Sequence, residues 1–190
     1  AVESGATGIL RAAGRPGIGI DLKILDDDGN EVPTEEAGEV CVRGPNVTPG
    51  YLNRPEENEK AFKNGWFHTG DVGRVDKNGV MFLMDRKKDM IVSGGENIYT
   101  SEVEAALYKH PDVFECAVIG LPDDKFGESL FAVIVTAPDQ TLSEEIIINH
   151  CRDLIAGYKI PRQMDFVEEL PKSAMSKILK NELRDIYSKK

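Results

Sequence analysis

The sequence of 190 residues has few of the features that identify several common classes of protein. Its three cysteines, Cys41, Cys116 and Cys151, are far apart and form no C-x-x-C pair, so they indicate neither a disulfide framework nor a cysteine zinc site. This pattern favours a reducing compartment, and we expect a cytoplasmic protein. No hydrophobic run approaches the ~18 residues that a membrane-spanning helix needs. The first residues also lack the basic and then apolar pattern of a signal peptide.

Basic residues are outnumbered by acidic ones. The chain has 23 lysines and arginines against 33 aspartates and glutamates, which gives a formal net charge of −10. This sign of charge disfavours nucleic acid and anionic membranes as general partners. The content of hydrophobic residues is 41%, enough for a real core in one large or two small domains.

Strand patterns broken by turns fill the first part of the chain. Residues 18–25 and 38–43 are predicted strands, and an acidic turn over residues 26–30 separates them. A short helix is predicted over residues 55–62, because proline is tolerated at the first position of a helix. The Asn78-Gly79 pair predicts a β-hairpin between the runs on either side of it. Residues 1 to about 84 are therefore expected to be mostly β.

Helices and strands alternate after Asp85. The periodicity predicts helices over residues 101–110, 143–155 and 177–187, and strands over residues 116–120, 130–136 and 164–167. Ser101 and Glu104 have the spacing of a capping box at the start of the first helix. This part is predicted to be a small α+β unit.

The stretch MDRKKDMIVSGGENIYTSEVE at residues 84–104 places clustered cations and a glycine pair before a predicted helix. Bare backbone N–H groups ahead of a helix can bind phosphate, but no G-x-x-x-x-G-K-[ST] pattern supports that interpretation. Gly94-Gly95 could be an ordinary strand-to-helix turn with positive φ. It could equally be a place where the backbone must approach a ligand closely.

Four motifs in register resemble the last third of the adenylate-forming superfamily. They are WFHTGD at 66–71, DRKKDMIVSGGENIYTSEVE at 85–104, LPKSAMSK at 170–177, and GEVCVRGPNVTPGYLNRPEENEKAF at 38–62. That superfamily contains acyl-CoA synthetases, aryl-CoA ligases, luciferases and the adenylation domains of peptide synthetases. The acyl-CoA synthetase branch is the most similar, because its fatty-acid and aryl-acid ligases commonly carry a stretch like SGGENIYPSEVE.

The resemblance implies an α+β fold in two parts. Residues 1–87 would be the β-rich terminal subdomain of the large adenylating domain, and residues 88–190 the small α+β C-terminal lid domain, which moves. The family's phosphate loop and acyl pocket would lie upstream of residue 1, so this chain is expected to be inactive alone. Residues 4–8, Ser-Gly-Ala-Thr-Gly, resemble that phosphate loop, but they lie too near the later motifs and lack the Pro-Lys that follows it.

The resemblance also implies a reaction in two steps. A carboxylate attacks the α-phosphorus of ATP to give acyl-AMP and pyrophosphate, and the thiol of coenzyme A then takes the acyl group. ATP, Mg²⁺ and coenzyme A would serve the whole enzyme, with fatty acid metabolism as the setting and the upstream part of the adenylating domain as partner. Phosphates would hold the metal, since His68, His110 and His150 show no metal-ligand spacing.

Individual residues acquire roles only through the resemblance. Asp71 would accept hydrogen bonds from the ribose hydroxyls, and Arg86 would reach the ribose or a phosphate of the nucleotide. Lys88 would be the hinge that absorbs a rotation between two domain poses. Gly94-Gly95 would line the tunnel for the pantetheine arm of coenzyme A. Lys177 would be catalytic, because an ammonium there stabilises the charge that develops at the α-phosphate.

Plainer interpretations exist for these residues. Asp71 could be a solvated turn residue, residues 86–88 a solvated linker, and Lys177 one lysine of a basic tail. Ser176 stands where the family usually has glycine, so a requirement for positive φ would cost roughly a kcal/mol or more of strain. Thr100 replaces a common proline and could cap the following helix. The role of His68 stays open.

Two alternatives to a coenzyme A ligase remain. An adenylation domain that delivers to a carrier protein would use nearly the same lid. A non-catalytic, lid-like interaction module is the other alternative, and Ser176 is the feature that supports it. Asp71 and Lys177 are both present, which favours an enzyme. The sequence leaves the acid open between aliphatic and aromatic compounds.

Overall fold

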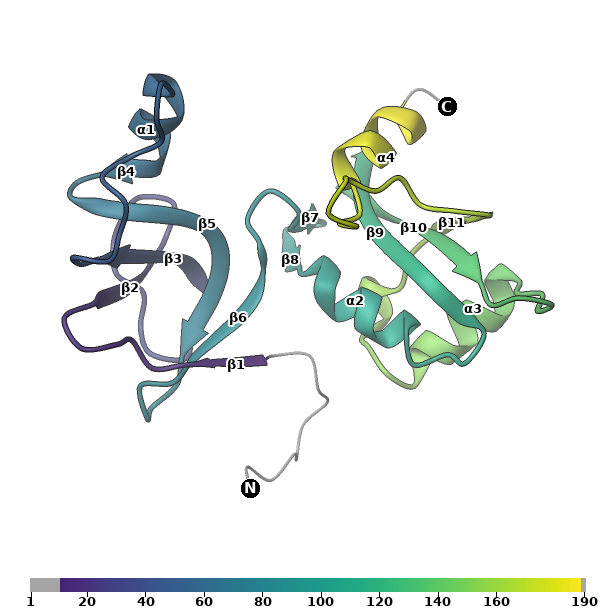
Figure 1. The fold of residues 1–190 in the computed structure, drawn as a ribbon. Coiled ribbons are helices and arrows are strands. Elements are labelled where there is room, and N and C mark those ends of the chain that lie inside the picture. The colour runs from purple at the N-terminus through teal and green to yellow at the C-terminus, as the bar shows by residue number, and fades with distance from the viewer. Residues whose placement is uncertain (1–10, 189–190) are drawn as a thin grey trace. The chain divides into compact units, whose positions relative to one another are not determined.

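The computed structural model describes residues 11–188, which divide between Lys88 and Asp89 into two compact units (Figure 1). The division predicted from the sequence lies one residue earlier, between Lys87 and Lys88. Both units combine strands and helices, so the predicted α+β class is confirmed. The rejected phosphate-loop candidate at residues 4–8 lies outside the described residues.

The first unit is built on an antiparallel sheet with the strand order β1-β6-β5-β3-β2, and β4 pairs with β5. A short helix, α1 (Pro55–Ala61), begins at its proline as predicted and carries acidic residues in its first turn. The strands are β1 (Arg11–Gly14), β2 (Asp21–Leu25), β3 (Gly38–Arg43), β4 (Phe62–Lys63), β5 (Trp66–Val75) and β6 (Met81–Arg86).

The predicted hairpin at Asn78-Gly79 joins β5 to β6. The Asp76 carboxylate accepts hydrogen bonds from the backbone N–H groups of Asn78 at 2.9 Å and Val80 at 2.8 Å. Gly79 has a φ of 75°, which a glycine adopts without strain. The turn starts the β5–β6 pairing, and a one-residue register shift between Val72 and Gly73 then places Asp71 opposite Arg86.

The second unit has a sheet in which β10 (Gly127–Thr136) pairs with β9 in antiparallel and with β11 in parallel orientation. A small hairpin, β7–β8, joins the same sheet through β10. The other strands are β7 (Ile91–Ser93), β8 (Glu96–Ile98), β9 (Val113–Asp123) and β11 (Gln163–Val167). The helices are α2 (Thr100–Leu107), α3 (Glu144–Arg152), the 3₁₀ helix η1 (Gly157–Lys159) and α4 (Lys180–Tyr187).

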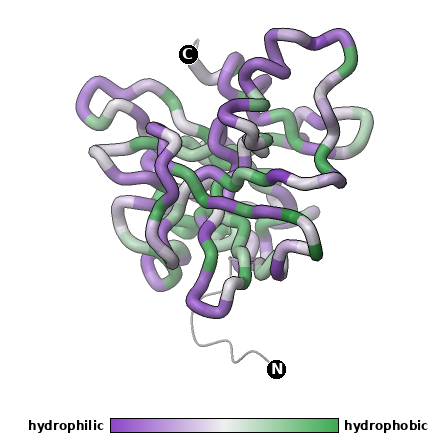
Figure 2. Tube along the Cα trace, turned by 90° about the vertical axis from the view of Figure 1, so that its left-hand side faces the viewer, coloured by the Kyte–Doolittle hydropathy of each residue, from purple (hydrophilic) through white to green (hydrophobic). Residues whose placement is uncertain are grey.

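Both faces of the β9–β10 pair are buried. Alternate residues of a strand point to opposite faces. Val118 and Ile134 therefore join the core under α2 and α3, while Ile119 and Val133 join a second cluster with residues of α4. Burial on both faces explains the nearly continuous apolar runs in these strands. Elsewhere short hydrophobic and hydrophilic stretches alternate (Figure 2), and no described helix is long and apolar enough to span a membrane.

The start of α2 differs from the prediction. The helix begins at Thr100, after an extended Tyr99 whose side chain makes no capping hydrogen bond, so Thr100 and Ser101 lie within the helix and neither is its N-cap residue. The Glu104 carboxylate instead accepts from the backbone N–H of Val118 at 2.8 Å and pairs with Lys180 Nζ at 2.6 Å. The contacts of Glu104 with β9 and α4 therefore fix its side chain, in place of the capping box that the local sequence predicts.

The other two helices follow the sequence more closely. Ser143 caps α3, since its hydroxyl accepts from the backbone N–H of Ile146 at 3.4 Å. The predicted helix over residues 177–187 begins three residues late, at Lys180. The residues before it form a tight turn instead, which matters for the candidate site.

We expect the Glu104→Ala substitution to lower the free energy of unfolding of the second unit by about 2–3 kcal/mol, because it removes hydrogen bonds to a charged group that join α2, β9 and α4. Urea denaturation followed by circular dichroism measures this change. Glu168→Ala is the matched control, because this exposed glutamate lies in the same unit and should change stability by less than ~0.5 kcal/mol. Equal losses in the two variants would contradict the role of Glu104.

Candidate functional site

Asp71 and Arg86, the two residues predicted to bind nucleotide, lie side by side in the first unit. They are cross-strand partners in β5 and β6, and Arg86 Nε lies 2.8 Å from Asp71 Oδ1. The Asp71 side chain is 26% exposed and that of Arg86 57% exposed. The pair thus offers an accessible carboxylate and guanidinium together, which suits a ligand that has both hydroxyls and phosphates.

The backbone bulges out of the sheet at Asp71. Because Glu39 pairs with Val72 and Cys41 with His68, three residues of β5, Thr69–Asp71, lie opposite a single residue of β3. Gly70 has a φ of 71° within this bulge. Bulges of this kind redirect side chains at the edges of functional sites.

One carboxylate holds the bulge in place. Glu39 Oε1 accepts a hydrogen bond from Gly70 N at 3.2 Å, and Lys87 N donates to Gly70 O at 2.8 Å. The Thr69 hydroxyl accepts from Asp71 N at 3.1 Å. The backbone of Asp71 is therefore fixed from both sides before any ligand binds.

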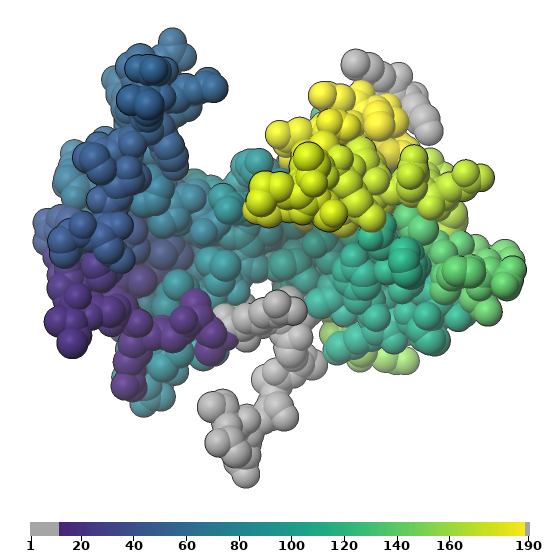
Figure 3. All heavy atoms as spheres, in the orientation of Figure 1, coloured from purple at the N-terminus to yellow at the C-terminus, as the bar shows by residue number. Residues whose placement is uncertain are grey.

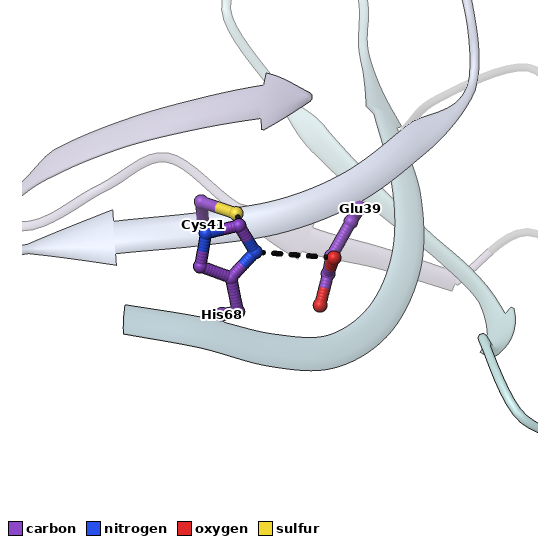
Figure 4. Close-up of side chains that lie close together, drawn as sticks. All are labelled: Glu39, Cys41 and His68. Atoms are coloured by element: carbon purple, nitrogen blue, oxygen red, sulfur yellow. Dashed lines mark hydrogen bonds and ion pairs between the residues drawn. The ribbon is translucent and has the colours of Figure 1, made fainter. Parts of the chain in front are cut away.

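The second oxygen of Glu39 has partners of its own. Its Oε2 lies 3.1 Å from Lys87 Nζ and 3.1 Å from His68 Nδ1, and Cys41 Sγ lies 3.3 Å from the same ring nitrogen (Figure 4). Lys87 Nζ also pairs with Asp27 at 2.8 Å. Glu39 is only 11% exposed, so this carboxylate depends on its partners to stay charged.

These contacts shift the protonation of the groups involved. Burial alone raises the pKa of the Glu39 carboxyl, but hydrogen bonds from His68 and Lys87 outweigh it and hold that pKa below its ordinary value. Burial lowers the pKa of Lys87, yet its bonds to Asp27 and Glu39 raise it overall. Burial, followed by the charge of Glu39, raises the pKa of the Cys41 thiol to about 11.

Sequence reasoning missed Glu39 and Lys87. Glu39 sits in a strand 31 residues before Gly70, so no local spacing connects the two. The sequence predicts Lys87 only as part of a charged linker, although its side chain contacts Glu39 and its backbone N–H contacts Gly70 in the bulge. The β3–β5 and β5–β6 registers together bring these residues into contact, and a single sequence does not give those registers.

Lys88 is the last residue of the first unit. Its side chain is exposed, and the backbone leads from β6 to β7 at this point. Its role as a hinge stays a prediction.

Gly94-Gly95 forms the two-residue turn of the β7–β8 hairpin, with Ser93 and Glu96 paired on either side. The interpretation as a strand-to-helix turn is therefore wrong, because a strand follows the glycines and α2 begins only at Thr100. The φ values of 62° and 86° explain the glycines, since two-residue hairpins favour positive φ at both positions. A Cβ on Gly95 would meet no atom within 4 Å, so this turn has open space beside it.

Lys177 ends a tight turn on the surface of the second unit, in the segment drawn yellow in Figure 3. Ser173 N donates to Lys177 O at 2.8 Å, and Lys177 N donates to the Ser173 hydroxyl at 3.2 Å. Ser176 N also donates to Ser173 O at 2.9 Å. The exposed Lys177 side chain therefore projects from a backbone that is fixed by hydrogen bonds.

Ser176 has a φ of 58°. This position therefore adopts the left-handed conformation whose cost was considered from the sequence. A serine there carries the strain that a glycine would avoid.

Comparisons with known proteins identify relatives of this chain. The family model of the AMP-binding enzyme C-terminal domain matches residues 102–177, and the model of the AMP-binding enzyme matches residues 4–52. A long-chain-fatty-acid–CoA ligase of Escherichia coli O6:H1 is 44% identical over 172 residues, which are 90% of this chain and 30% of that ligase. The chain spans about a third of the length of the curated relatives it matches.

Solved structures of similar proteins have the same fold as this chain. The o-succinylbenzoate CoA synthetase of Bacillus subtilis, in complex with its acyl-adenylate intermediate, has a TM-score of 0.86 and 41% identity, over 92% of this chain and 35% of that one. The same enzyme in complex with ATP and a magnesium ion has a TM-score of 0.84 and 40% identity, over 92% of this chain and 36% of that one.

We expect Ser176→Gly to raise the free energy of unfolding of the second unit by about 0.5–1 kcal/mol, because relief of the left-handed strain exceeds the entropy that glycine loses on folding. Urea denaturation measures the gain. Ser176→Ala is the control, since it removes the hydroxyl but keeps the Cβ and should give no gain. If the alanine variant gains as much unfolding free energy as the glycine variant, the serine hydroxyl, and not the backbone strain, lowers the stability.

Proposed function

We propose that the chain is the C-terminal part of an AMP-forming acid–thiol ligase, because it matches the family models of the AMP-binding enzyme and of its C-terminal domain. The whole enzyme activates a carboxylic acid with ATP to give acyl-AMP and pyrophosphate, and then transfers the acyl group to coenzyme A. The first unit is the terminal subdomain of the large adenylating domain, and the second unit is the lid. Upstream residues of that large domain complete the site.

The ion pair between Asp71 and Arg86 is the observation that carries this proposal. The two residues are 15 positions apart in the sequence, yet the β5–β6 register brings their side chains to 2.8 Å, on a bulge that is already held by Glu39. The Asp71 carboxylate accepts hydrogen bonds from the ribose hydroxyls, and the Arg86 guanidinium contacts the ribose or a phosphate. A fixed pair of this kind loses little conformational entropy when the nucleotide binds.

Lys177 acts in the first step. Negative charge grows on the oxygens of the α-phosphate as the carboxylate attacks, and a fixed ammonium stabilises that charge. The exposure of Lys177 supports this role, because a side chain on the surface of one unit can reach a nucleotide bound to another. The hydrogen bonds of the Ser173–Lys177 turn keep the backbone fixed under it.

Gly94-Gly95 acts in the second step, after a rotation at Lys88 brings the β7–β8 hairpin to the nucleotide. The turn projects no side chain, and space is open beside Gly95, so the narrow pantetheine arm of coenzyme A can pass along it. Only the backbone at Lys88 takes part in the rotation.

The cofactors and substrates follow from this chemistry. The enzyme uses ATP with Mg²⁺ and coenzyme A, and the phosphates supply the ligands of the magnesium ion. The acid is either a fatty acid or an aromatic acid, since the relatives include ligases for both. The three cysteines are free thiols, all buried, which supports a cytoplasmic setting.

The proposal is tested by the Lys177→Ala substitution in the enzyme that contains this chain together with its upstream domain. We expect formation of acyl-AMP to fall by about 10²- to 10³-fold, as on loss of one preorganised charge-stabilising group. The attack of coenzyme A on supplied acyl-AMP should continue at its usual rate. Lys109→Ala, an exposed lysine of the same unit, is the control and should leave both steps unchanged. Equal damage to both steps in the Lys177 variant would refute the two-pose mechanism.

Gly95→Trp should produce the reverse pattern, because an indole beside the turn blocks the pantetheine path while adenylation proceeds. The φ of 86° strains any side chain at this position, so the effect of bulk must be separated from the effect of the backbone. Gly95→Asn provides that control, since asparagine tolerates positive φ and is short. We expect the second half-reaction to be slower in the tryptophan variant than in the asparagine variant. If the two variants transfer the acyl group equally fast, the hairpin does not line the tunnel.

A further inference from the structure

Glu39, Cys41 and His68 place one oxygen, one sulfur and one nitrogen within 4.8 Å of one another, from strands β3 and β5 of the first unit (Figure 4). Glu39 supports the Asp71 bulge through its other oxygen, but the proposed reaction uses neither the thiol of Cys41 nor the ring of His68. The thiol is fully buried. A set of carboxylate, thiol and imidazole is a donor set that divalent metal ions bind in proteins.

The nitrogen and oxygen atoms of this cluster have hydrogen-bond partners, but the one ring nitrogen cannot serve both the carboxylate and the thiol. His68 Nδ1 faces both Glu39 Oε2 at 3.1 Å and Cys41 Sγ at 3.3 Å. If Nδ1 carries a proton, it donates a hydrogen bond to the carboxylate, and the thiol proton then has no acceptor on the ring. If Nδ1 is bare, it accepts from the thiol, and its lone pair then faces the Glu39 carboxylate. A cation bound among the three atoms removes this conflict, because each of them then acts as a ligand.

Two of the three separations between ligand atoms are close to those around a small tetrahedral ion, and the third, between sulfur and oxygen, is within 4.8 Å. Zinc binds sulfur at about 2.3 Å and nitrogen or oxygen at about 2.0–2.2 Å, which places neighbouring ligands about 3.6 Å (S···N) and 3.4 Å (N···O) apart. The observed separations of 3.3 Å and 3.1 Å differ from those values by about 0.3 Å each. A shift of this size requires only small side-chain rotations.

The surroundings also accommodate the charge. Thiolate and carboxylate together balance a dication, and the thiol proton leaves to the solvent as the metal binds. Lys87 loses its contact with Glu39 Oε2 but keeps its ion pair with Asp27 at 2.8 Å, so its ammonium is not left without a partner. A pocket of about 280 Å³ is lined by Glu39, His68 and Lys87 among other residues, so it reaches two of the three ligands from the solvent and has room for a water as fourth ligand, while the Cys41 thiol lies buried behind them.

We propose that Glu39 Oε2, Cys41 Sγ and His68 Nδ1 form a binding site for Zn²⁺. Sulfur and imidazole ligands select a borderline-soft ion such as zinc, whereas Mg²⁺ prefers oxygen ligands alone. The site is therefore distinct in its chemistry from the magnesium that accompanies ATP. It lies beside the bulge that carries Asp71, since Glu39 serves both through its two oxygens.

Metal titrations of the 190-residue chain test the proposal without any assay of enzyme activity. Co²⁺ replaces zinc as the spectroscopic probe, and a cobalt–thiolate charge-transfer band together with the visible bands of a tetrahedral ion is expected at one equivalent. Zn²⁺ should then displace the cobalt and abolish these bands. An absence of the charge-transfer band, or binding of Co²⁺ without it, would overturn the proposal.

Variants identify the ligands. Cys41→Ala should remove the charge-transfer band, and it should weaken zinc binding by at least ~10-fold, since loss of even an outer-sphere partner costs about 10- to 100-fold. Cys151→Ala is the matched control, because this cysteine is equally buried but lies in the second unit, and it should bind zinc as the unaltered chain does. His68→Gln provides an independent loss of one ligand if the Cys41 variant does not fold, as circular dichroism would reveal. Zinc binding that survives both ligand changes, or is lost equally in the Cys151 control, contradicts the assignment.

Discussion

The Glu39 carboxylate is the contact on which the geometry of the first unit depends. One oxygen holds the backbone of the bulge at Gly70, and the other holds Lys87, whose own backbone N–H returns to Gly70 O. Asp71 and Arg86 each lie one residue from this closed arrangement. A carboxylate that is 11% exposed is costly to bury, and only the hydrogen bonds that it accepts offset this cost. The position of the Asp71–Arg86 pair is thus set by a charge that lies outside the motifs containing the pair.

The second unit positions its residues by a different principle. Burial of both faces of β9 and β10 fixes a rigid sheet, and the polar contacts of Glu104 and Lys180 tie α2 and α4 to it. Gly94-Gly95 and Lys177 lie on turns that leave this core, and each turn is closed by its own backbone hydrogen bonds or strand pairs. Neither turn needs a ligand to acquire its shape. The shapes of both turns are therefore set by contacts within the second unit alone.

Local patterns predicted most of the elements, because turn residues and apolar periodicity are visible in a short window. The β5–β6 hairpin at Asn78-Gly79 is confirmed, and so is a helix that starts just after Ser143. The capping box at Ser101 was wrong, because Glu104 has stronger partners in β9 and α4. The sequence could not predict the bulge, the role of Glu39 or the cluster around His68. These features depend on the register between β3 and β5, which no local signal encodes. The roles of Asp71, Arg86 and Lys177 rested on the family resemblance alone.

Ser176 shows how function and stability can conflict in one turn. The Ser173–Lys177 turn requires a left-handed residue just before the lysine, and this chain supplies one with a Cβ. The left-handed conformation costs a serine about 1–2 kcal/mol, yet the hydrogen bonds of the turn are all formed. The left-handed serine therefore does not break the turn that holds the backbone of the lysine. For this reason the serine does not support a degenerate module, since the backbone that presents Lys177 has the same shape that a glycine would give it.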